Sequence, residues 1–300
     1  MDHKTFLAQM PPDRTAALTH RSNRAGLLHL AGHLTLILTT GTAIALNAPL
    51  WPLLMLAQGV FIIFLFTLEH ETTHQTPFAN RTLNEIVGHG AGLLIFLPLT
   101  WFRYFHLAHH RHTNDPDHDP ELLAGHKPDC WKAYLLHVTG YGYWTGVGKT
   151  LFTNAFGTIQ APYIPNRATR RLRTEARLYL AFYALIALSL TQSQLLLWTW
   201  LIPILLGQPF LRLYLLAEHS RCPQVADMLD NTRTTFTTRF VRFIAWNMPY
   251  HTEHHTMPNV PFHQLPNLHN DMAKALKHTA PSYTAFTKSY AASLRPPKAH

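Results

Sequence analysis

The chain has 300 residues, a length that fits one large domain or two small ones. Only 14% of its residues are charged and 47% are hydrophobic, which excludes a disordered or acidic solvating chain. Its 25 Lys and Arg against 16 Asp and Glu give a net charge of +9, and its 2 cysteines exclude a disulfide scaffold or a thiolate-rich zinc module.

The first apolar stretch covers residues 25–68 and contains no Asp, Glu, Lys or Arg. A membrane-spanning helix needs about 20 apolar residues, and Pro49 interrupts this stretch near its middle. We therefore predict two spans at about 25–46 and 50–69, joined by a tight turn. The polar residues 1–24 do not resemble a cleaved signal peptide and are expected to form an N-terminal arm.

Two segments between the apolar stretches suit the membrane interface. Residues 86–100 are apolar but short, with three glycines and Pro98, so a re-entrant or interfacial helix is expected rather than a full span. Residues 131–164 are rich in aromatic residues and glycine, which is typical of an interfacial belt.

A second charge-free stretch covers residues 178–211. Two spans fit here, at about 173–191 and 195–216, if the charged side chains at the start of the first one reach the lipid headgroups. Residues 25–269 are then expected to form one membrane domain, followed by a C-terminal tail at 270–300.

The distribution of basic residues predicts the orientation. Both hairpin turns lack Lys and Arg, so both termini and the middle region are expected on the cytoplasmic side. The chain has no run of five basic residues, and we expect no nucleic-acid partner. The predicted fold class is an all-α integral membrane protein with four transmembrane helices in two hairpins, a cytoplasmic histidine-rich cap and interfacial helices. A bacterial inner membrane is favoured over the endoplasmic reticulum. The alternative, a soluble helical core, is disfavoured because the apolar helices show no polar face.

Histidines gather in three clusters just outside the apolar segments. These are His70 and His74, then His106, His109 and His110, and finally His251, His254 and His255. Residues four apart share one face of a helix, so each cluster can offer a pair of imidazoles to one metal. The predicted topology brings all three clusters to the same side, and eight imidazoles exceed the capacity of one metal, which indicates a dinuclear site. Imidazole alone does not decide between zinc, copper, iron and nickel.

Other polar residues near the clusters are weaker candidates for metal binding or for orienting the ligands. His29 and His33 also have helical spacing, but such an isolated pair is more often packed or water-facing than metal-binding. Nearby carboxylates could accept hydrogen bonds from ring N–H groups and orient the ligands: Glu71, Glu218, Glu253, Asp115 and Asp119. His112 is a further candidate for such a supporting contact.

The spacings HX3H, HX2HH and HX2HH resemble the integral-membrane fatty acid desaturase and hydroxylase superfamily. The strings Asn247-Met248-Pro249-Tyr250 and Pro258-Asn259-Val260-Pro261 around the third cluster are also similar to desaturase sequence. The resemblance covers roughly residues 25–269. It implies a centre of two iron ions held almost wholly by histidine, O2 as co-substrate, and attack on a C–H bond of a lipid chain.

The resemblance also implies residue roles and partners. The extra histidine that usually follows the fourth span corresponds to His219, expected as a ninth ligand, whereas His126 and His278 are not expected to be ligands. No catalytic residue is expected beyond the metal ligands. The chain carries no recognisable heme motif of the cytochrome b5 type, so a separate electron donor of the ferredoxin, rubredoxin or cytochrome b5 type, with its reductase, is expected. We expect desaturation of an acyl chain, with hydroxylation as the alternative.

Two rival functions remain at this point. Residues 70–74 also read as HExxH, the zinc-protease motif in which Glu71 would be the general base, but that reading leaves most of the clustered histidines unexplained. A metal transporter would hold its ions near the membrane midplane, whereas these clusters flank the spans.

Overall fold

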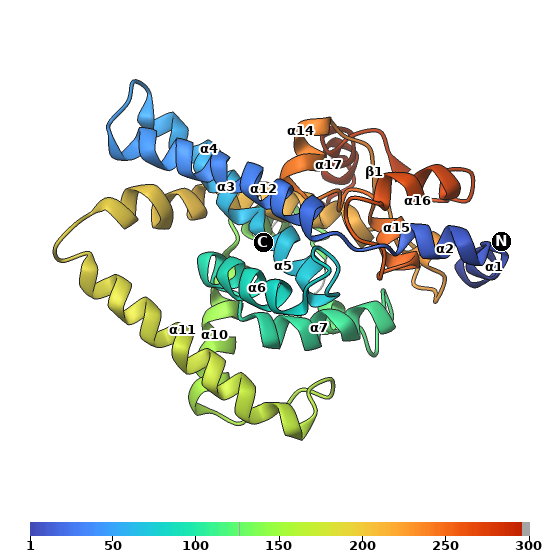
Figure 1. Cartoon of the computed structure of the whole chain (residues 1–300), viewed down its shortest axis with the longest axis horizontal. Coiled ribbons are helices and arrows are strands. Elements are labelled where there is room, and N and C mark those ends of the chain that lie inside the picture. Colours follow the sequence, from blue (N-terminus) through green and yellow to red (C-terminus); the bar gives the residue numbers. More distant parts are fainter. Residues whose placement is uncertain (126, 296–300) are drawn as a thin grey trace.

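The computed structural model describes residues 1–125 and 127–295 and consists mostly of helices (Figure 1). His126 and the last five residues of the predicted tail lie outside the described residues.

The N-terminal half begins with two short helices and a long helical hairpin. Its helices are α1 (His3–Gln9), α2 (Pro12–Leu18), α3 (Asn23–Ala45), α4 (Trp51–Ile63) and α5 (Leu65–Thr73). The Ser22 side chain caps α3 by accepting a hydrogen bond from the Ala25 amide, and the turn to α4 places Asn47 and Leu50 in the left-handed region. The predicted break near Pro49 is therefore present.

Among the described residues, three helical segments are long and apolar enough to cross a membrane: Pro12–Ala45, Trp51–Thr73 and Leu197–His219. Only 11% of the apolar window of the first is buried inside the protein, as expected for a helix that faces lipid. These segments agree with three of the four predicted spans.

The region predicted as re-entrant or interfacial forms a bent pair of helices, α6 (Arg81–Ile95) and α7 (Leu99–Arg111). Their axes differ by 97° at a break where Phe96 adopts a left-handed conformation and Pro98 precedes α7. Proline lacks an N–H group and restricts the residue before it, so a continuous helix cannot pass through this point. The pair is not a straight crossing, although it could count as a fourth, broken span.

The middle of the chain contains α8 (Pro120–Leu123), α9 (Trp131–Val138), α10 (Tyr141–Phe156), the 3₁₀ turn η1 (Asn166–Ala168) and α11 (Thr169–Ser189). Helix α11 covers most of the predicted third span, but its charged first half keeps it out of the three segments that qualify by length and composition. A four-span topology therefore stays a prediction.

A short π-helix, η2 (Leu197–Leu201), leads into α12 (Ile202–His219), which crosses α4 at very close range (Figure 1). Gly59 and Gly207 meet at this crossing. A Cβ atom on Gly59 would overlap the Pro203 carbonyl oxygen, and one on Gly207 would overlap the Gly59 carbonyl group. Small residues allow helix backbones to approach in this way, so the two glycines fix how α4 and α12 pack.

The C-terminal third adds α13 (Met228–Asn231), β1 (Thr234–Thr235), α14 (Arg239–Ile244), α15 (His251–Thr256), α16 (Leu265–Met272), β2 (Thr279–Ala280) and α17 (Tyr283–Ala292). The strands pair in parallel, with Thr234 opposite Thr279. With two residues in each strand, the described part of the chain stays mostly helical, in agreement with the predicted all-α class. The pairing attaches part of the predicted tail to the domain.

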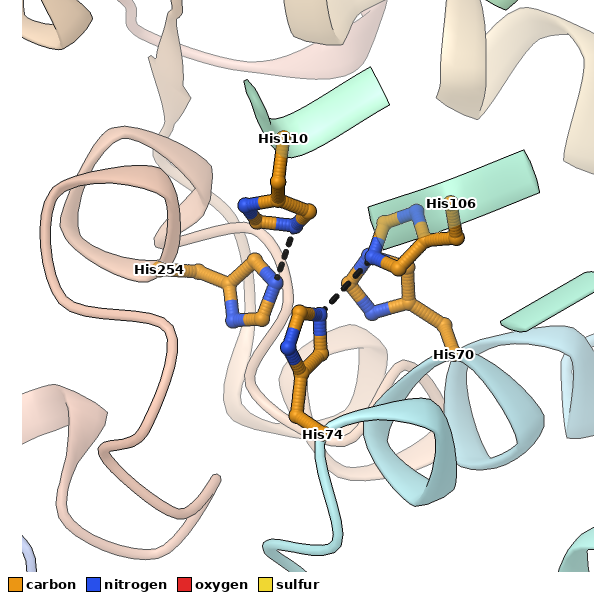
Figure 2. Close-up of side chains that lie close together, drawn as sticks. All are labelled: His70, His74, His106, His110 and His254. Atoms are coloured by element: carbon orange, nitrogen blue, oxygen red, sulfur yellow. Dashed lines mark hydrogen bonds between the residues drawn. The ribbon is translucent and has the colours of Figure 1, made fainter. Parts of the chain in front are cut away.

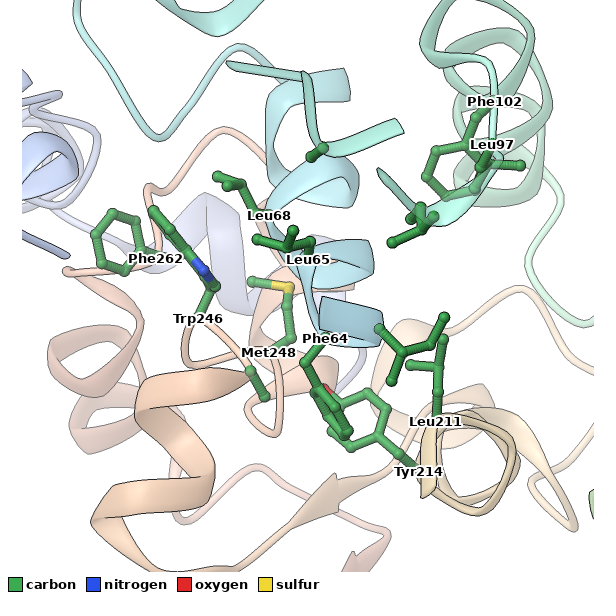
Figure 3. Close-up of a cluster of buried hydrophobic side chains, with 14 of the residues drawn as sticks. Phe64, Leu65, Leu68, Leu97, Phe102, Leu211, Tyr214, Trp246, Met248 and Phe262 are labelled. Atoms are coloured by element: carbon green, nitrogen blue, oxygen red, sulfur yellow. The ribbon is translucent and has the colours of Figure 1, made fainter. Parts of the chain in front are cut away.

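The main core joins α5 and α12 to the C-terminal loops (Figure 3). Phe64 and Tyr214 pack edge to face at 5.2 Å between ring centroids, and Trp246, Met248 and Phe262 are buried near Leu65 and Leu68 in the same cluster.

His29 and His33 belong to this packing rather than to a metal site. His33 Nε2 lies 2.8 Å from the Phe61 carbonyl oxygen and His33 Nδ1 accepts from Trp246 Nε1 at 3.1 Å. His29 Nε2 lies 2.7 Å from the Phe243 carbonyl oxygen. The pair therefore fastens α3 to its neighbours, as expected for an isolated pair.

Candidate metal centre

Four helices bring the clustered histidines together. Helix α5 carries His70 and ends just before His74, α7 carries the second cluster, α12 ends at His219, and α15 carries the third cluster. Each helix turns its histidines inward because residues three and four apart lie on one face. All nine predicted ligands lie in the same region of the protein.

Five of these imidazoles form the first group (Figure 2): His70, His74, His106, His110 and His254. Each offers one ring nitrogen, and these nitrogens lie within 4.8 Å of one another. His74 Nε2 is 2.9 Å from His106 Nε2, and His110 Nε2 is 3.1 Å from His254 Nε2. One ion could be held among them.

The second group contains His109, His219 and His255, which satisfy the same distance criterion. His251 joins it, because His251 Nε2 lies 3.0 Å from His219 Nε2. The two groups touch where the rings of His110 and His255 stack at 4.0 Å. The arrangement therefore offers two neighbouring metal positions.

The ring nitrogens of the second group face one another, as the ligands of a shared metal ion would. His219 Nδ1 lies 3.2 Å from the Asn231 carbonyl oxygen and His109 Nδ1 lies 2.9 Å from the Asp119 carboxylate, so in each ring Nδ1 carries the proton. Their Nε2 atoms nevertheless face each other at 3.2 Å. Two lone pairs at that distance repel unless a metal ion or a shared proton lies between them. With metal–nitrogen bonds of about 2.1 Å, adjacent ligand nitrogens would lie about 3 Å apart, as these do.

Contacts behind the rings hold the imidazoles in place. Asp119 accepts from His109, Asn231 accepts from His219, and Thr113 Oγ1 lies 3.1 Å from His255 Nδ1. Such contacts fix the tautomer of a ligand histidine and orient its ring. The sequence did not indicate Asn231 or Thr113 as supporting residues. Neither lies in a motif, and only the folding of the chain brings them next to the histidines.

Two predicted supporting carboxylates lie near ligand rings, at longer distances. Glu218 Oε1 is 3.5 Å from His251 Nδ1, and Glu71 Oε1 is 3.7 Å from His254 Nδ1. Glu71 Oε2 accepts hydrogen bonds from Thr76 Oγ1 and the Phe262 amide. Glu71 Oε2 is therefore held by protein groups, whereas Glu71 Oε1 has no hydrogen-bond partner among the described residues.

Glu253 is a correction, because it points away from the centre. On α15 it lies on the opposite face from the histidines, and its carboxylate binds His269 Nδ1 at 2.5 Å and Thr234 Oγ1 at 2.5 Å.

Asp115 and His112 are the second correction. Asp115 Oδ2 binds His118 Nδ1 at 2.9 Å, and together with His112 these side chains form a separate, partly exposed group. Asp119, four residues later, is the carboxylate that reaches His109, because Asn114 turns the chain with a φ of 62°.

The third cluster is held in the neutral form that binds metals. Burial lowers the pKa of His251, His254 and His255 well below the ordinary value for histidine, and the neighbouring imidazoles lower it further. His278 is not part of either group, since its Nε2 lies 3.8 Å from Asp230 at a half-exposed position.

The chain is similar in sequence to known desaturases. The sequence profile of the family described as fatty acid desaturase matches residues 45–287. The sphingolipid delta(4)-desaturase DES1 of Drosophila melanogaster is 29% identical over 245 residues, which are 77% of this chain and 68% of that protein.

Two further relatives match this chain over very different lengths. The dihydrorhizobitoxine desaturase of Bradyrhizobium elkanii is 27% identical over 232 residues, 71% of this chain and 65% of that protein. A chloroplastic omega-3 fatty acid desaturase of Glycine max is 36% identical over 73 residues, 24% of this chain and 16% of that protein. The chain thus spans less than two thirds of the length of some relatives.

Proposed function

The chain belongs to the fatty acid desaturase family, and from that premise we propose that it is an O2-dependent lipid desaturase that introduces a double bond into an acyl chain. Family membership confirms an oxidoreductase and favours desaturation over the hydroxylase alternative. The observation that carries the proposal is the pair of adjoining imidazole groups with facing nitrogens.

The proposed ligands are all nine clustered histidines, holding two iron ions. The chemistry of the donor set fits, because neutral imidazole binds iron and the buried ring nitrogens of His70 and His255 Nε2 have no hydrogen-bond partner among the described residues. The bound metals would supply the O2 activation that an unactivated C–H bond requires, since ordinary acid–base chemistry cannot break such a bond.

The surroundings of the first group suit a hydrocarbon chain. The Phe102 ring stacks on His106 at 5.4 Å between centroids, and Phe66 packs on Phe102 at 5.3 Å. His74 and His110 are half-buried whereas the other ligands of this group are buried, so the centre is reached most directly beside these two rings. The protein would hold the chain against this apolar wall and exclude water from it.

The electron balance of the reaction implies a further partner. Removing two hydrogens from the acyl chain releases two electrons, whereas reduction of O2 to two water molecules takes four electrons and four protons. A separate donor of the ferredoxin, rubredoxin or cytochrome b5 type, with its reductase, would supply the remaining two electrons.

Lipid analysis of a host that expresses the protein tests the function. The product should be two hydrogen atoms lighter than its substrate, and it should be absent from a His109→Ala strain and present in a His278→Ala strain. A product one oxygen atom heavier would contradict desaturation, and equal products in the two variant strains would contradict the metal centre.

The proposed topology has four spans, with the centre and both termini on the cytoplasmic side. It rests on the three apolar segments, on α11 as the remaining span, and on hairpin turns without Lys or Arg. With Cys130 and Cys222 replaced by Ser, cysteines at positions 47 and 192 should react from the non-cytoplasmic side and one at 282 should not. The reverse pattern at either turn would contradict the topology.

We propose a bacterial inner membrane as the location; the Bradyrhizobium elkanii relative supports it, whereas the Drosophila melanogaster and Glycine max relatives are eukaryotic. Membrane fractionation of a bacterial host tests this location, because the protein should be recovered with inner-membrane markers. Recovery with another membrane would contradict it.

A further inference from the structure

A cavity of about 660 Å³ lies between α6 and α11, outside the two imidazole groups. Its walls include His89 and Leu93 of α6, Thr100 at the start of α7, and the first four turns of α11. Tyr179 and Tyr183 of α11 hold the two helices together by donating to the His89 and Leu93 carbonyl oxygens at 3.1 and 3.0 Å.

One end of the cavity is basic. Arg167 lies in η1, and Arg170 and Arg171 lie in the first turn of α11; all three line this end of the cavity. Arg171 pairs with Glu85 at 2.8 Å. Within residues 1–125 and 127–295, Arg167 and Arg170 have no ion-pair partner, and both are exposed.

One polar group in the cavity wall has no hydrogen-bond partner among the described residues. Thr100 is 2% exposed, and its hydroxyl has no hydrogen-bond partner among the described residues. Its backbone amide is already satisfied by Glu175, whose Oε1 lies 2.9 Å away. The same carboxylate lies 3.1 Å from His89 Nδ1, so the one acidic side chain in the cavity wall is engaged by protein groups.

The other end of the cavity is apolar and continues onto the lipid-facing surface. Leu93 and Phe182 line it, Leu178 is 64% exposed, and Leu185, two turns further along α11, is 65% exposed. A basic start followed by an exposed apolar face is the arrangement of a helix that enters a membrane from its headgroup region.

We propose that this cavity binds an anionic phospholipid, with its phosphate against the arginines and its acyl chain along Leu178 and Phe182. Guanidinium groups bind phosphate oxygens in a fixed fork geometry, and Arg167 and Arg170, which are not taken up by an ion pair among the described residues, can bind the two non-bridging oxygens of a phospholipid phosphate. The Thr100 hydroxyl then donates to the lipid ester region. This site is separate from the metal centre and does not depend on the proposed reaction.

Native mass spectrometry of the protein purified in detergent tests the proposal, with phosphatidylglycerol and phosphatidylcholine of equal acyl chains as probes. Phosphatidylglycerol should bind preferentially. The Arg167→Ala/Arg170→Ala variant should bind it about tenfold more weakly, which is the expected scale for losing hydrogen bonds between charged groups. The matched control Arg24→Ala/Arg239→Ala removes the same charge from exposed sites elsewhere and should retain the preference.

Further arms separate the possible ligands. Inorganic phosphate or oleate should not displace phosphatidylglycerol at equal concentration, and displacement by either would overturn the assignment to a phospholipid. Thr100→Val, which keeps the volume of the side chain, should also weaken binding. If this variant and the double-arginine variant both bind as the unmodified protein does, or if the control loses as much affinity, the proposal is wrong. Binding should persist after the metal is removed, so this result stands apart from any failure of the proposed desaturase activity.

Discussion

His109 and Asp119 form a buried pair, with His109 Nδ1 2.9 Å from Asp119 Oδ1 and both side chains 2% exposed. Asp119 also accepts from the Asn114 amide at 2.7 Å and from the Glu121 amide at 2.9 Å. One carboxylate therefore orders the loop after α7 and orients a ring of the second imidazole group.

Replacing Asp119 with Ala should lower metal affinity about 10- to 100-fold, the usual effect of losing a hydrogen bond behind a ligand histidine. Asp119→Asn keeps an acceptor oxygen and should lose less. Metal content after equilibration with a competing chelator measures the effect. Asp115→Ala is the control, because Asp115 contacts His118 instead, and an equal loss in that variant would contradict the role of Asp119.

Loss of His219 should remove metal and activity together. His219 Nε2 faces both His109 Nε2 at 3.2 Å and His251 Nε2 at 3.0 Å, so His219→Ala leaves a gap in the second group. Iron content per chain and turnover should both fall, whereas His278→Ala should leave both near the unmodified values. Full iron content with normal turnover in a folded His219→Ala protein would show that His219 is not a ligand.

Removal of metal should destabilise the protein. Buried imidazole nitrogens that face one another are costly without a cation between them. A ligand present at 100 times its dissociation constant stabilises the folded state by about 2.7 kcal/mol, so chelation should lower the thermal unfolding midpoint by several degrees. Addition of Fe²⁺ should restore it, and a midpoint unaffected by the chelator would contradict a metal-bound core.

The close crossing of α4 and α12 should not tolerate a side chain. Gly207→Val would place atoms against the Gly59 backbone, and overpacking of this kind costs about 1–3 kcal/mol or more. Gly90→Ala in α6 is a matched control, because its Cβ would meet nothing within 4 Å. That substitution should be neutral or stabilise the helix by up to about 1 kcal/mol. Thermal unfolding in detergent compares the two variants, and equal midpoints would contradict the packing.

Attachment of the N-terminal helix should depend on pH. Asp227 accepts from the His3 amide and from Lys277 Nζ, each at 2.9 Å. Burial alone would raise the pKa of Asp227, but these hydrogen bonds lower it below the ordinary 3.8. The stabilisation is therefore present above about pH 4 and is lost as the pH falls further.

Asp227→Asn should accordingly lower the free energy of unfolding at neutral pH by about 1 kcal/mol, since the group is partly exposed, and by clearly less at about pH 2, closer to the lowered pKa of the folded carboxyl. Metal-free protein is used for both measurements, so that loss of metal in acid does not contribute. A loss of the same size at both pH values would contradict an ionised Asp227 as the source.

The sequence predicts that the clustered histidines come together, as the structure shows, but it predicts few of the contacts behind their rings. His70 and His74 share a helix face through local spacing alone, but His29 and His33 have the same spacing and bind the Phe243 and Phe61 carbonyl oxygens, respectively. Whether a histidine pair faces other histidines or packs against carbonyl groups depends on residues some 30 to more than 200 positions away in the chain.

The loop after α7 shows the same limit. Asp115 and Asp119 are equivalent by composition, and only the left-handed turn at Asn114 decides which one reaches His109. The parallel strand pair was likewise beyond sequence reasoning, because each strand has two residues and no alternation to recognise.

The glycine crossing of α4 and α12 implies which parts of this chain can change length during evolution. Gly59 precedes His70 and Gly207 precedes His219 on nearly continuous helix. Inserting one residue in either interval would rotate the following histidines by about 100° around the helix axis and shift them by about 1.5 Å. These two intervals should therefore keep a constant number of residues among relatives.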